Sequence, residues 1–123
     1  MKKVSYSERK TFVQYDEKHV VLYLNEEPAE ITNEETGETV QGYSYTGSME
    51  DGGTLIEAAN VTDGNRRAKF ISGLLGTEYD IDAQIAILAN GDDTNEHAEE
   101  KAIFMANRRI VKEQVDALLA REI

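Results

Sequence analysis

The spacing of apolar residues changes about halfway along this 123-residue chain. Up to about residue 47, apolar and polar side chains alternate or run together in short segments, as they do in β-strands. From residue 62 onward, apolar side chains recur every three or four positions, which is the period of an amphipathic helix. The pattern therefore predicts an α+β fold in which N-terminal antiparallel β-hairpins are followed by about three α-helices.

The first expected hairpin lies in residues 10–25. The side chains of residues 10–15 are expected to alternate between the two sides of an extended strand, and residues 16–18 form a polar turn. Residues 19–25 are apolar on both faces of an extended chain. Such a strand is central in its sheet or covered on its second side.

A second hairpin is expected from residues 30–35 and 38–46, which are joined around Gly37. Pro28 precedes this hairpin and has no backbone N–H to donate. It therefore belongs at the start or the edge of a strand, and not in the middle of a sheet.

The chain is expected to form a single domain, because 123 residues can bury one core but not two. Within it, residues 1–47 form the hairpins, residues 48–61 a connector, and residues 62–123 the helical part. Residues 54–59 fit a helical turn and a buried strand equally well, so the sequence leaves their conformation open.

The first helix is expected to begin at Thr62, a residue type that caps helix N-termini, and to stop at Gly76. Gly73 falls inside this helix and weakens it by about 1 kcal/mol relative to alanine. One face of the helix carries four apolar residues, Phe70, Ile71, Leu74 and Leu75.

The pattern predicts two further helices after Gly76. Asp80 caps a short helix that ends at Asn90 and Gly91. Its apolar face holds Ile81, Ile85 and Leu88. The last helix runs from Asn95 to Ala120, and its apolar stripe consists of Ile103, Phe104, Ile110, Val111, Val115, Leu118 and Leu119.

The charge narrows the classes of partner. With 24 acidic and 13 basic residues, the formal net charge is −11. Such a chain repels nucleic acids and anionic membranes, so we expect no direct nucleic-acid binding and no membrane association. There is no cysteine, no visible signal peptide in residues 1–10 and no apolar run of about 20 residues. We therefore expect a cytoplasmic protein, or one assembled in a phage particle.

The sequence shows no constellation of catalytic or metal-binding residues. His97 stands three residues before Glu100, but no second histidine completes a metal motif. The acidic loop 91–96 lacks the spacing of a calcium-binding EF-hand loop, and a helix cap explains its residues. We predict no enzymatic activity, no catalytic or metal-ligating residues and no cofactor.

The second hairpin supplies the candidate interaction residues. Tyr43 and Tyr45 share one strand face, and tyrosine is enriched at protein interfaces. Glu34, Glu35 and Glu38 cluster near the turn. Two interpretations stay open for each group. The tyrosines cover the core or meet a partner, and the glutamates discourage aggregation or dock on a basic surface.

Three segments of the second half carry a resemblance: Gly53–Ala58, Phe70–Leu75 and Tyr79–Asn90. With the acidic break and long helix that follow, they resemble small uncharacterised proteins encoded by phages and prophages of gut bacteria. The resemblance covers a little over half of the chain. It implies a phage origin and a virion or assembly role, and it transfers no site residues.

These observations favour a non-enzymatic protein-interaction or structural protein, which acts through a protein partner or through self-association. An acidic inhibitor that mimics the charge of nucleic acid is one alternative. An enzyme whose site is assembled only in space is another.

Overall fold

The computed structural model describes residues 1–121 and confirms the α+β fold, with antiparallel strands first and helices after. The elements are β1 (Lys2–Tyr6), β2 (Phe12–Gln14), β3 (His19–Leu22), β4 (Glu27–Thr32), β5 (Thr39–Gly47), β6 (Thr54–Glu57), α1 (Arg66–Gly76), α2 (Ile81–Asn90) and α3 (Asn95–Ala120).

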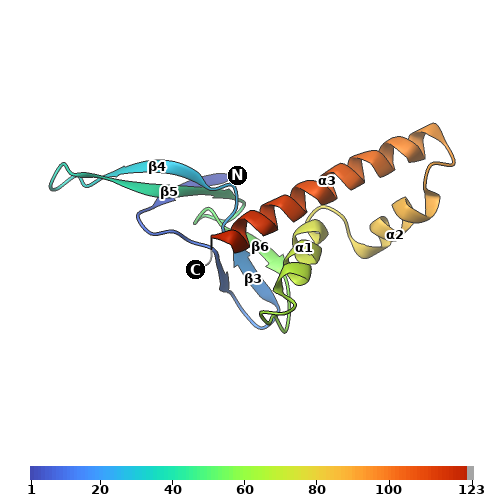
Figure 1. Ribbon diagram of the computed structural model, residues 1–123, viewed down its shortest axis with the longest axis horizontal. Coiled ribbons are helices and arrows are strands. Elements are labelled where there is room, and N and C mark those ends of the chain that lie inside the picture. Colours follow the sequence, from blue (N-terminus) through green and yellow to red (C-terminus); the bar gives the residue numbers. More distant parts are fainter. Residues whose placement is uncertain (122–123) are drawn as a thin grey trace.

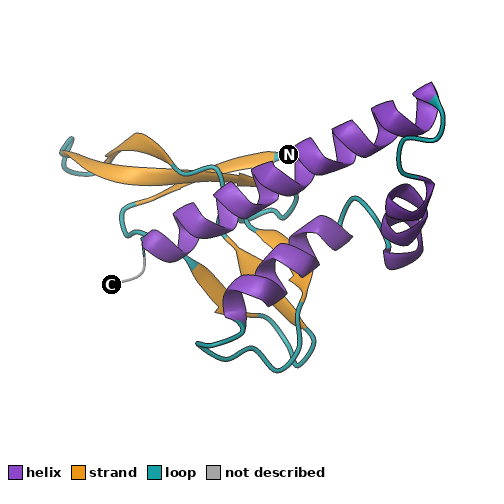
Figure 2. Cartoon of the chain, turned by 45° about the vertical axis from the view of Figure 1, so that its right-hand side comes forward, coloured by secondary structure: helices purple, strands orange, loops and turns teal. Residues whose placement is uncertain are grey.

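The strands form two three-stranded antiparallel sheets, with the orders β1-β5-β4 and β2-β3-β6. In Figure 1 the β4–β5 hairpin projects from one end of the molecule, and α2 lies at the other end beneath the start of α3. Figure 2 shows α1 lying across the β2-β3-β6 sheet, with α3 passing above it.

Strand β3 is the central strand of its sheet and is covered on both faces, as its sequence predicts. Val20 and Leu22 belong to the main core together with residues of α1 and α3. Val21 points to the opposite face, where it packs in a second cluster with Tyr23 and Tyr45. The prediction for Pro28 is also confirmed, because Pro28 is the second residue of the edge strand β4.

The connector contains a strand, which settles the conformation of residues 54–57. β6 pairs with β3 in the register Ile56 opposite Val20. The β part of the chain therefore extends beyond residue 47 to Glu57. The pattern of residues 54–59 fits helix and strand equally well, so the partner strand β3 decides between them.

Helix α1 begins later than predicted. Its N-cap is Asn65, not Thr62, because residues 62–65 form a turn in which the Asn65 side chain accepts a hydrogen bond from Thr62 N–H (2.7 Å). Gly76 is the last helical residue, and Thr77 is the C-cap. The four predicted apolar residues of this helix are all buried, namely Phe70, Ile71, Leu74 and Leu75.

Gly73 lets α1 approach the sheet closely. A Cβ atom at this position would lie 2.6 Å from the carbonyl oxygen of Glu57 and 3.1 Å from the side chain of Ile56. The close contact between α1 and β6 explains a glycine in the middle of a helix.

The limits of α2 and α3 agree with the prediction. The Asp80 carboxylate accepts a hydrogen bond from Ala83 N–H (2.7 Å), and Gly91 ends α2 with a positive φ of 58°. Thr94 caps α3 through its hydroxyl. The predicted apolar faces are only partly buried, because Ile103 and Ile110 of α3 and three residues of α2 are exposed.

Candidate functional site

Helix α2 exposes most of its large apolar side chains. Ile81, Ile85 and Leu88 are 71%, 60% and 53% exposed, whereas Ile87 is 5% exposed. Residues spaced by four and three positions lie on one helix face, so the three exposed residues form one stripe. Burial of an aliphatic side chain of this size is worth about 1.5–3 kcal/mol. A contiguous exposed stripe of this kind is typical of an interaction site.

The first turn of α2 is held in place by Tyr79. Its ring packs edge-on against Phe104 of α3, with 5.0 Å between the ring centres. Its hydroxyl accepts a hydrogen bond from Asn107 (2.9 Å), and its carbonyl accepts one from the Gln84 side chain (3.1 Å). Together with buried Ile87, these contacts fasten α2 to α3 and leave the opposite face of α2 uncovered.

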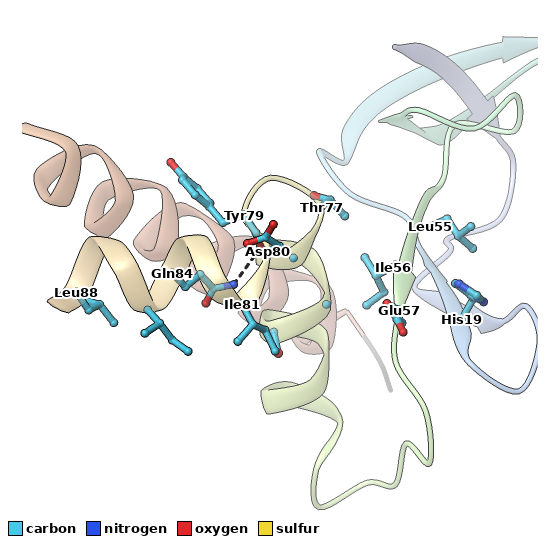
Figure 3. A pocket seen from close by; sticks show the side chains of 14 residues that line it. His19, Leu55, Ile56, Glu57, Thr77, Tyr79, Asp80, Ile81, Gln84 and Leu88 are labelled. Atoms are coloured by element: carbon cyan, nitrogen blue, oxygen red, sulfur yellow. Dashed lines mark hydrogen bonds between the residues drawn. The ribbon is translucent and has the colours of Figure 1, made fainter. Parts of the chain in front are cut away.

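The exposed stripe borders a groove of about 860 Å³ that runs between α2, the end of α1 and β6 (Figure 3). Strand β6 contributes Leu55, Ile56 and Glu57, three consecutive residues whose side chains point to both faces of the sheet. The groove therefore reaches the edge of β6. The end of α1 contributes Ser72, Gly73 and Gly76, whose small size widens the groove.

The charges that line the groove are mainly negative. Glu57 and Asp80 carry carboxylates, and none of the lysines and arginines among the described residues lines it. His19 lies at the β6 end, where its Nδ1 atom pairs with the Asp16 carboxylate at 2.8 Å. Basic side chains would therefore be favoured beside this groove.

The polar groups near the groove are engaged locally. The Thr77 hydroxyl donates a hydrogen bond to the carbonyl of Leu74 (2.7 Å), and the Asp80 carboxylate caps α2. In Figure 3 His19 lies across β6 from both of these residues. Within residues 1–121, no group of three or more histidine, aspartate or glutamate side chains could hold a metal ion. The arrangement is suited to binding an apolar segment.

A second concave region, lined by Leu24, Ile110 and their neighbours, has charges that neutralise one another. Glu26 accepts hydrogen bonds from Arg9, Arg121 and the Tyr45 hydroxyl, each at 2.8 Å. Burial alone would raise the pKa of Glu26, but these three donors outweigh it and lower the pKa to about 2. The network ties the end of α3 to the strands, so its role is structural.

The predicted interaction residues of the hairpin fall in different environments. Tyr45 is fully buried in the second cluster, so the prediction that it meets a partner is wrong. Tyr43 is partly buried, with the Arg9 guanidinium 5.4 Å from its ring centre. The face shared by the two tyrosines is covered by the core, as the other interpretation allowed.

Glu34, Glu35 and Glu38 are exposed at the turn of the β4–β5 hairpin. This turn lies at the opposite end of the molecule from α2 (Figure 1), so these glutamates do not contribute to the groove. Their contact with a partner stays a prediction. The stripe of α2 was visible in the sequence, but its pattern was that of a face buried in the core.

Within the described residues, no helix is both long and apolar enough to cross a membrane. No protein-family model, curated protein or solved structure matches this chain.

Proposed function

We propose that the chain is a non-enzymatic protein-interaction module that holds a segment of a partner protein in the α2 groove. The observation that carries the proposal is the stripe of Ile81, Ile85 and Leu88, which is exposed along one side of the groove. The resemblance to phage and prophage proteins adds a second part to this proposal, a role in a virion or its assembly.

The groove charges support a partner segment that combines apolar residues with lysine or arginine. Such a segment would bury its apolar side chains against the stripe and place its cations near Glu57 and Asp80. A second copy of this chain fits less well, because each copy carries a net charge of −11.

The acidic-inhibitor alternative is less supported by the fold. The hairpin glutamates and the acidic residues of segment 92–96, Asp92, Asp93 and Glu96, lie at opposite ends of the molecule (Figure 1). Charges divided in this way do not form one continuous face that resembles a nucleic-acid backbone.

A displayed library of random 12-residue peptides tests the proposal. Peptides enriched on the wild-type chain should contain apolar residues and at least one lysine or arginine. They should lose at least tenfold in affinity for Ile85→Lys, because this substitution places a charge in the stripe. The matched control is Ile103→Lys, since Ile103 is equally exposed, at 60%, but does not line the groove.

Two results would contradict the proposal. One is a library with no enrichment above a blank surface. The other is an equal loss of binding for Ile85→Lys and Ile103→Lys, which would mean that the peptide does not bind in the groove. Both variants are first compared with the wild type by circular dichroism and thermal unfolding, so that a loss of binding is not a loss of fold.

A further inference from the structure

We propose that the partner segment binds in an extended conformation and adds a strand to the free edge of β6. This inference rests on the proposed function, because it names the conformation of the segment that the groove holds. Its starting point is the sheet order β2-β3-β6, in which β6 has a neighbouring strand on one side only among the described residues.

The hydrogen-bond pattern shows which groups of β6 face this edge. The Ala58 N–H donates to the carbonyl of Lys18 (2.8 Å), so Ala58 points toward the β3 side. In an antiparallel pair, residues point alternately toward and away from the partner strand. Ile56 therefore bonds to β3, whereas the N–H and C=O groups of Leu55 and Glu57 point away from it.

Helix α1 closes one part of the edge and leaves the rest open. Gly73 lies against the outward carbonyl of Glu57, where even a Cβ atom would come within 2.6 Å. Within residues 1–121, the backbone hydrogen bonds outside the helices and strands include none to the N–H and C=O of Leu55 or to the N–H of Glu57, so these groups are available to a new strand. One residue of an antiparallel segment could exchange both hydrogen bonds with Leu55, as strands added to sheet edges do.

The groove is continuous with this edge, which links the backbone of the segment to the α2 stripe. Leu55 and Glu57 line the same groove as Ile81, Ile85 and Leu88. Side chains alternate along a strand, so every second residue of the segment would face the helices and the next would face solvent. The segment should therefore alternate apolar and polar residues.

The charge at the edge of β6 indicates whether the added strand comes from another protein or from a second copy of this chain. Glu57 ends β6 and is exposed, so it favours a lysine or arginine on the incoming segment. A second copy of this chain would bring its own net charge of −11 to the same edge. We therefore assign the site to a basic, alternating segment of another protein.

The test uses the tightest-binding library peptide, in variants that each carry one N-methyl group on the backbone. Methylation at the residue opposite Leu55 should weaken binding at least tenfold, because it removes the donated hydrogen bond and adds bulk at the edge. Methylation at the two adjacent residues should change affinity less than threefold. In the complex, amide exchange should slow at least tenfold at Leu55 and stay unchanged at Ile56, which already bonds to β3.

Four outcomes would overturn the inference, and the last of them would overturn the proposed function as well. The peptide could bind as a helix, in which case the sensitive methylation positions would recur every three to four residues and circular dichroism would show added helix. The inference would then be wrong and the proposed function would stand. If the peptide binds but amide exchange at Leu55 does not slow, the inference is again wrong and the proposed function stands. If light scattering shows a dimer that Ile85→Lys abolishes, the occupant is a second copy. If no peptide binds, the proposed function itself is wrong.

Discussion

Helices α1 and α2 follow one another in the chain and carry similar apolar stripes, yet their stripes lie in different environments. In α1, Phe70, Ile71, Leu74 and Leu75 are all buried, because the helix lies across a sheet. In α2, Ile81, Ile85 and Leu88 are each more than half exposed, because the helix lies beyond the sheet and is fastened to α3 through its other face.

The difference shows what an amphipathic pattern can and cannot reveal. The pattern identifies a helix face whose burial is favourable, and it does so for both helices. It does not identify the element that covers this face. In α1 the cover is supplied by the chain itself, and in α2 we propose that a partner supplies it.

The largest expected effect on stability comes from a substitution in α1, whose apolar stripe is buried. Phe70→Ala should destabilise the protein by about 4 kcal/mol, because it leaves a cavity between α1 and the sheet. Chemical denaturation followed by circular dichroism measures this change. Tyr15→Ala is the control, because Tyr15 is an exposed aromatic residue, and its loss should cost less than about 1 kcal/mol. Equal effects would mean that α1 is not packed as described.

A second prediction concerns the network that holds the end of α3 to the strands. Glu26→Gln removes the carboxylate beside Arg9 and Arg121 and should destabilise the protein by about 2 kcal/mol at pH 7. Because the folded-state pKa of Glu26 is lowered from 4.5 to about 2, its contribution is present above pH 4.5. It is lost as the pH falls from 4.5 to about 2.

Denaturation curves of the wild type and of Glu26→Gln between pH 2 and 7 measure this difference. The two curves should converge toward pH 2. Glu27→Gln is the control, since Glu27 is exposed and pairs with Lys3 only at the surface (3.2 Å), and it should cost less than about 1 kcal/mol. A difference for Glu26→Gln that does not depend on pH would contradict the network.

The parts of the fold that the sequence predicted are those determined by neighbouring residues. The Asp80 cap, the limits of α3 and the two-faced burial of β3 all follow from local residue types and spacing. The conformation of residues 54–57 does not, because pairing with β3 decides it. Local residue types predict the start of α1 too early, because the turn at Asn65 takes Thr62 out of the cap position.

The candidate site was predictable only in part. The sequence shows the stripe of Ile81, Ile85 and Leu88, but its exposure depends on how Tyr79 and Ile87 fasten α2 to α3. The groove also needs the edge of β6, and the order of strands cannot be obtained from spacing. The sequence leaves the environment of Tyr45 open for a related reason, since alternation separates two strand faces without showing which one is covered.

A third prediction tests the approach of α1 to β6. Gly73→Ala should destabilise the protein by about 1–2 kcal/mol, because the new Cβ atom would press on the Glu57 carbonyl. Gly76→Ala is a matched control in the same helix, because no atom of residues 1–121 beyond its neighbours along the helix lies within 4 Å of its added Cβ atom. It should be neutral or stabilise by up to about 1 kcal/mol, as alanine favours helix. Thermal unfolding of the two variants compares them directly, and the same sign for both would contradict the contact.

The smallest expected effect on stability belongs to the exposed stripe. Ile85→Ser should change the free energy of unfolding by less than about 0.5 kcal/mol, because the side chain loses little burial. It should also lower the fluorescence of an apolar dye bound to the folded protein, because the stripe then offers less apolar surface. The control is Ile87→Ser on the same helix, since Ile87 is buried and should cost more than about 2 kcal/mol. A comparable loss of stability for both variants would mean that α2 packs its stripe against the body of the protein in solution. The groove would then be closed, and the contrast between α1 and α2 would disappear.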